Sequence, residues 1–284
     1  MRHVLSEEGR RKLRTLTTRS ILYAFDFDGT LAGISSDRGA VKLSKPIHEW
    51  LSELARRVPC AIVSGRAISD LLPRVDGAVP HLIGNHGLES PLTPPTALSV
   101  AQDVCHAWMK YVDIDLAQSL KVAGVEVENK RYSLTFHYQR ADESADMSKC
   151  KWLLELCRQL TPHPHCIVGK ASVNLLPPGS TGKGEAALAL MTHLRQSGLL
   201  FVGDDVTDEH VFGLTTGLVM GIRVGKHYDS RARFYLKRQE EIEDFIRFLI
   251  HRIDRTPEPA EPDDGLEIKK RRDPEKRTKS MSRY

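Results

Sequence analysis

Two aspartates stand two residues apart at the end of a short apolar run. Asp26 and Asp28 belong to the segment DFDGT, which follows the apolar residues 21–25. Side chains two positions apart on a strand point to the same side, so these carboxylates would repel each other and burial would raise their pKa values. Mg²⁺ neutralises such a pair and commonly uses one or two carboxylates together with a substrate phosphate. The pair predicts a magnesium and phosphate site; a helix cap or an Asx turn is the structural alternative.

A second acidic segment, GDDVTDE, follows the apolar run at residues 199–202. Its oxygen-bearing side chains outnumber what the N-cap of a helix needs, although acidic residues are also favoured in a first helical turn. Paired with DFDGT, this segment supplies the further carboxylate that a magnesium site requires.

Two more residues could hold phosphate oxygens. Ser64 ends the apolar run at residues 60–64, where a plain Ser-Gly turn is the alternative interpretation. Lys183 lies between two glycines at the start of an expected helix, where a lysine opposes the helix dipole and glycine lowers helix propensity. Both costs are understandable if an anion binds there, held by the lysine and by the N-terminus of the helix; a surface lysine is the alternative.

The apolar runs predict the framework that positions these residues. Strands are expected at residues 21–27, 60–64, 81–86, 199–202 and 217–224, and a helix at residues 43–58 with Ser44 as its N-cap. Short apolar strands alternating with helices indicate an α/β fold with a doubly wound parallel sheet. Ligands bind outside the carboxyl ends of the strands in such sheets, and the polar segments all lie there.

The pattern changes between residues 91 and 178. Alternating apolar residues at 121–138 predict an antiparallel hairpin, followed by a helix at 147–160 and one strand at 166–176. We therefore expect a core formed by residues 1–90 and 179–255, with a small α+β cap inserted at residues 91–178. Residues 256–284 lack periodicity and are rich in proline and charge, which predicts a disordered tail.

Composition narrows the class of protein. The chain carries a net charge of +4, but residues 269–284 alone carry +6, which leaves −2 for the rest. We therefore expect no nucleic-acid partner for the body and a basic tail only. No apolar run approaches the roughly 20 residues that span a bilayer. Five scattered cysteines without a CxxC pair suit a reducing cytoplasm. The oligomeric state is open.

Taken together, DFDGT, the Ser64 turn, the Lys183 turn and GDDVTDE resemble the haloacid dehalogenase (HAD) superfamily of phosphotransferases. The resemblance implies that Asp26 is the nucleophile and that Asp28 protonates the leaving alcohol and then activates water. It implies that Ser64 and Lys183 hold phosphate oxygens. It also implies that Asp204 and Asp208 complete a Mg²⁺ site with the first two aspartates.

Further motifs narrow the resemblance to the trehalose-6-phosphate phosphatase family. They are GNHGLE at residues 84–89, ENK at 128–130 and SLTFHY at 133–138. The resemblance implies hydrolysis of trehalose 6-phosphate, with cap residues Glu128 and Lys130 contacting the sugar; a cross-strand ion pair is the alternative for these two. The full set of candidate substrate-binding residues is Arg66, Asn85, His86, Glu128, Lys130 and Asn174.

The chain departs from the family pattern in one strand. Asn174 and Leu176 stand where the family usually has an acidic residue and an arginine. Asparagine can still bond hydroxyl groups, but it carries no charge. A different glycosyl phosphate or a hexose phosphate is therefore an alternative substrate. The rival functions are a phosphomutase and a non-catalytic sugar-phosphate-binding regulator.

Overall fold

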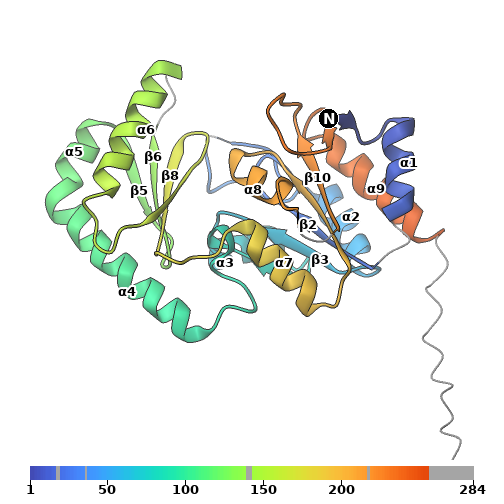
Figure 1. The fold of residues 1–284 in the computed structure, drawn as a ribbon, viewed down its shortest axis with the longest axis horizontal. Helices are drawn as coiled ribbons and strands as arrows, with labels where there is room; N and C mark the ends of the chain where they lie inside the picture. The colour runs from blue at the N-terminus through green and yellow to red at the C-terminus, as the bar shows by residue number, and fades with distance from the viewer. Residues whose placement is uncertain (17–19, 36, 139–142, 216–217, 256–284) are drawn as a thin grey trace, which may run out of the picture.

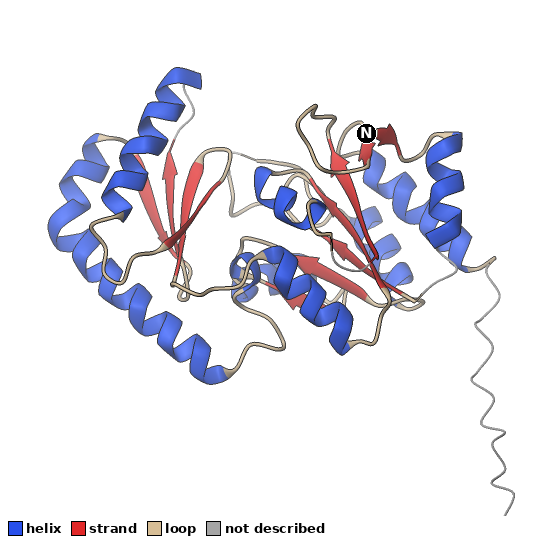
Figure 2. Ribbon diagram, in the orientation of Figure 1, coloured by secondary structure: helices blue, strands red, loops and turns tan. Residues whose placement is uncertain are grey.

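The strands of the protein form two separate sheets (Figure 2). The structure is a computed structural model and describes residues 1–16, 20–35, 37–138, 143–215 and 218–255. Every pairing in the seven-stranded sheet is parallel, and every pairing in the four-stranded sheet is antiparallel. This arrangement confirms the predicted α/β class with an additional α+β unit.

The larger sheet forms the core of the molecule. Helices cover both of its faces, and the interior strand β2 (Ile21–Phe25) is accordingly apolar at every position and buried along its whole length. In spatial order its strands are β1 (Arg2–His3), β11 (Phe234–Leu236), β10 (Leu218–Val224), β9 (Gly198–Gly203), β2 (Ile21–Phe25), β3 (Cys60–Val63) and β4 (His81–Ile83).

Alternate residues of β2 pack against different helices. Tyr23 and Phe25 belong to the apolar cluster formed with α2 (Lys45–Ala55) and α9 (Glu241–Ile253). Leu22 and Ala24 belong to the cluster formed with α7 (Lys183–His193) and α8 (Glu209–Phe212). Helices α1 (Glu7–Leu16) and α3 (Ile68–Val75) join the first cluster. The result is a three-layer core with helices on both faces of the sheet (Figure 1).

The smaller sheet forms the cap. Its helices lie on the side away from the core, where Trp108, Phe136 and Leu153 share a separate apolar cluster (Figure 1). The strand order is β5 (Val125–Asn129), β6 (Leu134–Tyr138), β8 (Ser172–Leu176) and β7 (His165–Val168). The helical elements are α4 (Pro95–Tyr111), the π-helical turn η2 (Val112–Leu116), α5 (Ala117–Val122) and α6 (Glu143–Cys157).

Several predicted elements differ from the observed ones. The single strand expected at residues 166–176 is wrong, because a turn at Gly169 divides it into the hairpin β7–β8. The strand expected at residues 81–86 ends at Ile83, because Asn85 and His86 adopt positive φ angles of 47° and 55° in the 3₁₀ turn η1 (Asn85–Gly87). The predicted helix at residues 43–58 is α2, whose N-cap Ser44 accepts a hydrogen bond from the backbone N–H of Ile47. The predicted disordered tail lies outside the described residues.

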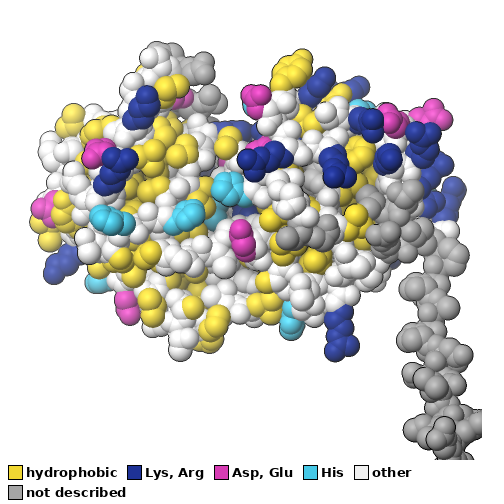
Figure 3. Space-filling view, in the orientation of Figure 1, with side chains coloured by type: hydrophobic (Ala, Val, Ile, Leu, Met, Phe, Trp, Pro, Cys, Tyr) yellow, Lys and Arg dark blue, Asp and Glu magenta, His cyan; other side chains and the backbone are white. Residues whose placement is uncertain are grey.

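Basic side chains also gather outside the tail. Arg10, Arg11 and Arg14 of α1 line a hollow that adjoins Arg252 and Arg255 at the end of α9, and dark blue side chains are dense over this region in Figure 3. The expectation for the body concerned its net charge, which this local group of arginines beside Glu7 and Glu8 leaves unchanged. Within the described part of the chain, no helix is both long and apolar enough to cross a membrane.

Candidate active site

A cavity of about 580 Å³ opens between the core and the cap. Its floor is the carboxyl edge of the larger sheet, and its opposite wall is the face of the cap sheet that carries no helices. The lining residues that the sequence singled out are Asp26, Asp28, Ser64, Arg66, His86, Glu128, Lys130, Asn174, Lys183 and Asp204.

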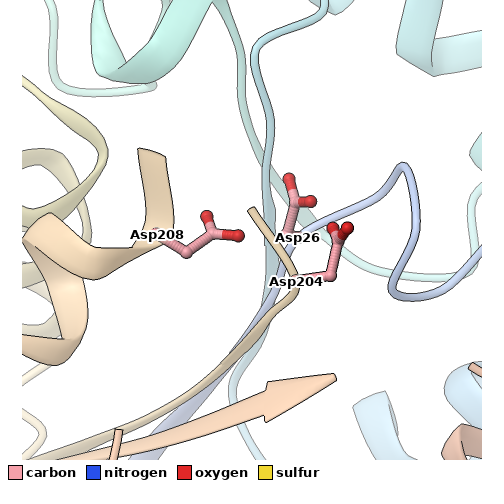
Figure 4. Close-up of side chains that lie close together, drawn as sticks. All are labelled: Asp26, Asp204 and Asp208. Atoms are coloured by element: carbon pink, nitrogen blue, oxygen red, sulfur yellow. The ribbon is translucent and has the colours of Figure 1, made fainter. Parts of the chain in front are cut away.

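Three buried aspartates meet on the floor of this cavity. Asp26, Asp204 and Asp208 each offer a carboxylate oxygen, and these oxygens lie within 4.8 Å of one another (Figure 4). Two glycines make the approach possible. A Cβ atom at Gly29, whose φ is +78°, would lie 2.4 Å from Asp204 Oδ2, and one at Gly203 would lie 2.3 Å from Asp208 Oδ2.

Lys183 binds two of these aspartates. Its Nζ lies 2.9 Å from Asp26 Oδ1 and 2.9 Å from Asp208 Oδ1, and the side chain is buried. Burial alone would lower the pKa of Lys183, but the charges of Asp208 and Asp26 and their hydrogen bonds raise it above its ordinary value. The predicted anion site at the start of α7 therefore faces the aspartate cluster, and its lysine is cationic.

The cluster fits a divalent cation. Burial raises the pKa of Asp26 well above its ordinary value, and the neighbouring Asp208 and Asp204 add to this effect against the opposing charge of Lys183. Asp204 Oδ1 is buried and meets no hydrogen-bond partner among the described residues. Buried carboxylate oxygens in excess of the positive charge, one of them unpaired, are the ligands that a hard cation requires.

Asp28 lies apart from this cluster. Its two carboxylate oxygens accept hydrogen bonds from Arg66, from Nε at 2.7 Å and from Nη2 at 2.6 Å. The expected grouping of its side chain with the other three aspartates is therefore not seen. The side chain is 40% exposed at the edge of the cavity, above the buried Asp26.

Ser64 and His86 form the part of the floor beside β3. The backbone N–H of His86 donates to the carbonyl oxygen of Ser64 at 3.0 Å, and the imidazole packs against Gly65. A Cβ atom at Gly65 would lie 2.6 Å from two ring atoms of His86. Burial, together with the nearby ammonium groups of Lys130 and Lys183, holds the pKa of His86 well below its ordinary value. The site thus presents a buried, neutral imidazole.

Three polar side chains of the cap line the cavity wall: Glu128 from β5, His137 from β6 and Lys130 from the turn between them. Glu128 Oε2 lies 2.7 Å from His137 Nε2 and 3.8 Å from Lys130 Nζ, and Lys130 also donates to the carbonyl oxygen of Gly65 in the core at 3.1 Å. Burial would raise the pKa of Glu128, but His137 and Lys130 lower it, so the carboxylate is ionised. Burial lowers the pKa of Lys130. These groups can hydrogen-bond a polar ligand above the floor.

The two candidate asparagines are used within the protein. Asn85 does not line the cavity; its amide donates to Glu89 Oε2 at 2.6 Å, and its Oδ1 accepts from Ser133 of the cap. Asn174 lines the cavity, but its Oδ1 accepts from Thr135 Oγ1 at 2.8 Å and its Nδ2 donates to the carbonyl oxygen of Ile167 at 3.1 Å. Both therefore support the structure around the cavity.

Sequence reasoning missed several charged residues on the cavity wall, among them Asp70, Arg74 and Lys170. Lys170, on the β7–β8 turn of the cap, pairs with Asp204. The only local signal of a turn is Gly169, directly before Lys170. Because one continuous strand was predicted at residues 166–176, the turn that carries Lys170 was not recognised. His137, within the SLTFHY motif, also lines this wall, where it contacts Glu128.

Comparisons with known proteins agree with this geometry. The family model described as "Trehalose-phosphatase" matches residues 24–232, most of the chain. The chain belongs to the trehalose-phosphatase family. The family lies in the HAD superfamily, as the sequence motifs predicted.

Relatives in the trehalose-phosphatase family are similar over most of this chain. A protein named trehalose-phosphate phosphatase from Mycobacterium bovis is 33% identical over 208 residues, which cover 69% of this chain and 52% of that protein. One of the same name from Mycobacterium avium is 31% identical over 74% of this chain and 55% of its own length. The chain thus spans about half the length of these curated relatives.

Solved structures share the fold. The C-terminal domain of trehalose-6-phosphate phosphatase from Candida albicans superposes with a TM-score of 0.68 at 21% identity, covering 88% of this chain and 98% of that one. A trehalose-6-phosphate phosphatase from Aspergillus fumigatus gives 0.55 at 25% identity over 85% of this chain and 97% of its own.

Proposed function

We propose that this protein is a Mg²⁺-dependent phosphatase that hydrolyses trehalose 6-phosphate to trehalose and inorganic phosphate. The observation that carries the proposal is the buried Lys183, which joins Asp26 and Asp208 on the floor of a cavity walled by polar cap residues. A cavity of about 580 Å³ lies in the range of ordinary small-molecule sites. The names of the curated relatives support the same substrate.

The proposed reaction has two steps that share one carboxylate. In the first, Asp26 attacks phosphorus, the bond from phosphorus to the sugar oxygen breaks, and Asp28 gives that oxygen its proton. In the second, Asp28 takes a proton from water, the water oxygen attacks phosphorus, and the bond to Asp26 breaks. Inorganic phosphate leaves, and both aspartates return to their starting forms.

Other residues of the floor would hold the phosphoryl group. Lys183 Nζ, already beside the nucleophile, and the Ser64 hydroxyl can donate to oxygens of the phosphoryl group. Asp26, Asp204 and Asp208 are the side chains that would hold Mg²⁺, with Asp28 at their edge. When bound, the ion supplies positive charge against the charge that develops on those oxygens.

The cap would recognise the sugar. We propose that Glu128 and Lys130 bond its hydroxyl groups, with the neutral His86 beneath them. The side-chain amide of Asn174 hydrogen-bonds to Thr135 and to the backbone of Ile167. This observation favours the second candidate, a phosphatase for a different glycosyl phosphate or a hexose phosphate. Closure of the cap over the substrate would exclude water from the first step.

The wider setting is also proposed. The two sheets and their separate apolar clusters support a core of residues 1–90 and 179–255 with an inserted cap at 91–178. The five cysteines are free thiols, which supports work in a reducing compartment such as the cytoplasm.

Phosphate release from a panel of sugar phosphates tests the proposal. Trehalose 6-phosphate, sucrose 6-phosphate and glucose 6-phosphate are each supplied with Mg²⁺ and with a chelator. Parallel reactions use Asp26→Asn and a matched control, Asp113→Asn, at an exposed residue of η2. We expect the wild type to release phosphate from trehalose 6-phosphate. Asp26→Asn and the chelator should each abolish this release, and Asp113→Asn should retain it. Selective release from another sugar phosphate would show that trehalose 6-phosphate is not the substrate. Release from none of them would contradict the proposed phosphatase activity.

A further inference from the structure

A row of alternating charges runs along the cavity wall from Asp28 through Arg66 and Asp70 to Arg74. Arg66 holds both oxygens of Asp28 and donates its Nη1 to Asp70 Oδ2 at 2.7 Å. Arg74 then donates to Asp70 Oδ1, from Nε at 3.0 Å and from Nη2 at 2.5 Å. The contact of Arg66 with both oxygens of Asp28 fixes the plane of that carboxylate as well as its distance, whereas Arg74 donates twice to a single oxygen of Asp70.

The far end of the row is anchored to the backbone. Arg74 Nη1 donates to the carbonyl oxygens of Gly39 at 2.7 Å and Val41 at 2.6 Å. The Arg74 side chain is 14% exposed and that of Arg66 is 12% exposed, whereas the Asp70 carboxylate between them is 36% exposed on the cavity wall. Residues 66, 70 and 74 are spaced four apart, which brings them together along one side of α3 and the turn that precedes it.

Asp70 joins the two arginines as an ionised carboxylate. Burial would raise its pKa, but the hydrogen bonds from Arg74 and Arg66 outweigh this and lower it. Asp70 therefore places one negative charge between the two guanidinium groups and holds them to each other.

The donors of Arg66 are already committed to protein groups. A guanidinium has five N–H donors. Four are engaged here: Nε and one Nη2 hydrogen on Asp28, and the Nη1 hydrogens on Asp70 and on the carbonyl oxygen of Arg38. Its guanidinium also lies over the Phe27 ring, 5.6 Å from the centroid. This arrangement leaves little capacity for a substrate and serves Asp28 instead.

We propose that Arg66, Asp70 and Arg74 are positioning residues that fix the orientation in which Asp28 protonates the leaving oxygen of the substrate. The inference rests on the proposed function, in which Asp28 is the proton donor, and it replaces the expectation that Arg66 binds substrate. Asp28 is part-exposed on a turn and, among the described residues, both of its oxygens have Arg66 as their hydrogen-bond partner. Without the contacts of Arg66, the carboxyl group of Asp28 can turn away from the leaving oxygen of the substrate, because an exposed side chain samples several rotamers.

The test compares leaving groups in the variant Asp70→Asn. The kcat/KM is measured for p-nitrophenyl phosphate, whose phenolate leaves without a proton, and for the sugar phosphate that the wild type cleaves, whose alkoxide needs one. We expect kcat/KM for the sugar phosphate to fall about tenfold or more, part of the full contribution of a general acid, with KM unchanged. For p-nitrophenyl phosphate, kcat/KM of Asp70→Asn stays within about twofold of the wild-type value.

Two further variants complete the experiment. Arg66→Lys keeps the charge but removes the two-point contact, so it gives the same difference between substrates and covers the case in which Asp70→Asn fails to fold. Asp244→Asn, at an exposed aspartate of α9 that pairs with Arg247 at 4.0 Å, is the matched control and leaves both rates unchanged.

Each outcome has a distinct meaning. Equal losses for both substrates would show a structural role and overturn the inference. A raised KM for the sugar phosphate without dependence on the leaving group would show that Arg66 binds the sugar, which also overturns it. A wild-type protein that cleaves neither substrate would overturn the proposed function, a separate failure that is seen before any variant is made.

Discussion

Lys170 of the cap forms an ion pair with Asp204 of the core. The lysine side chain, on the β7–β8 turn, is 43% exposed, whereas that of Asp204 is 8% exposed on the cavity floor. The ammonium group therefore lies on one of the three carboxylates that would hold the divalent cation. Contacts of Lys130 with Gly65 and of Arg38 with Glu126 also join the two units, so the charge of the floor and the position of the cap are linked.

Removal of this lysine should strengthen metal binding. In Lys170→Ala the carboxylate of Asp204 no longer has a competing cation, so we expect affinity for Mg²⁺ or Mn²⁺ to rise about two- to fivefold, the worth of a part-exposed ion pair. Isothermal titration calorimetry without substrate measures this directly. Lys110→Ala, at an exposed lysine of α4, is the control. Unchanged or weaker binding would show that Lys170 does not compete with the ion.

Loss of the lysine on the floor should destabilise the metal-free protein. Lys183→Met keeps a side chain of similar length but leaves Asp26 and Asp208 buried without their cation. We expect the free energy of unfolding in chelator to fall by about 3–5 kcal/mol, the usual cost of breaking a buried pair. Urea unfolding provides the measurement.

The same experiment carries its own checks. Mg²⁺ should restore part of the stability lost in Lys183→Met, because an ion that binds only the folded state stabilises it. Lys45→Met, at a lysine whose side chain is 89% exposed, should change the free energy of unfolding by no more than about 0.5 kcal/mol. An equally small change in Lys183→Met would contradict the ion-pair assignment.

The sequence predicted the floor of the site because its signals are local. Apolar runs mark buried parallel strands, and the residue types just after them mark the carboxyl edge; the sequence thus placed Asp26, Ser64 and Asp204 at one edge, and all three line the cavity. Lys183 was found because a lysine between glycines is unfavourable at the start of a helix. Each signal lies within a few residues of the side chain concerned.

The partners of these residues left no comparable signal. Arg66 meets Asp28 across 38 positions and Lys170 meets Asp204 across 34, so both pairs depend on tertiary packing and on rotamers. The spacing of Arg66, Asp70 and Arg74 was present in the sequence, but it is also that of an ordinary solvated helix face. Asn174 was assigned to the sugar because it stands where the family has an acidic residue; its hydrogen bonds to Thr135 and Ile167 on the neighbouring strands cannot be read from its own strand.

Asn174 itself provides a test of the cap. Asn174→Asp keeps the acceptor for Thr135 but places a carboxylate oxygen against the carbonyl oxygen of Ile167, where the amide now donates. We expect the free energy of unfolding to fall by about 1–3 kcal/mol, because a buried hydrogen bond is lost and its acceptor is left unpaired. Thermal or urea unfolding at neutral pH measures it.

A matched substitution lies in the same sheet. Asn129 uses its Oδ1 to accept from the backbone N–H of Arg131 at 2.8 Å, a contact that Asn129→Asp retains. This control should therefore unfold like the wild type. Equal stability of Asn174→Asp would instead indicate that the amide is free to turn toward the cavity and bind substrate, as the sequence first suggested.

The neutral imidazole of His86 predicts how stability depends on pH. Because burial and two ammonium groups lower its pKa in the folded protein, the unfolded chain takes up a proton near pH 6.5 that the folded chain does not. Its contribution to stability is therefore present above pH 6.5 and is lost as the pH falls, by about 1.4 kcal/mol per pH unit at most.

His86→Asn removes this dependence and retains a residue type that tolerates the positive φ. Urea unfolding of the metal-free protein at pH 7.5 and 5.5 should give a shallower loss for His86→Asn than for the wild type. His106→Asn, at an exposed histidine of α4, should keep the wild-type slope. If His86→Asn also keeps it, the imidazole is not held neutral and must accept a proton within the folded site.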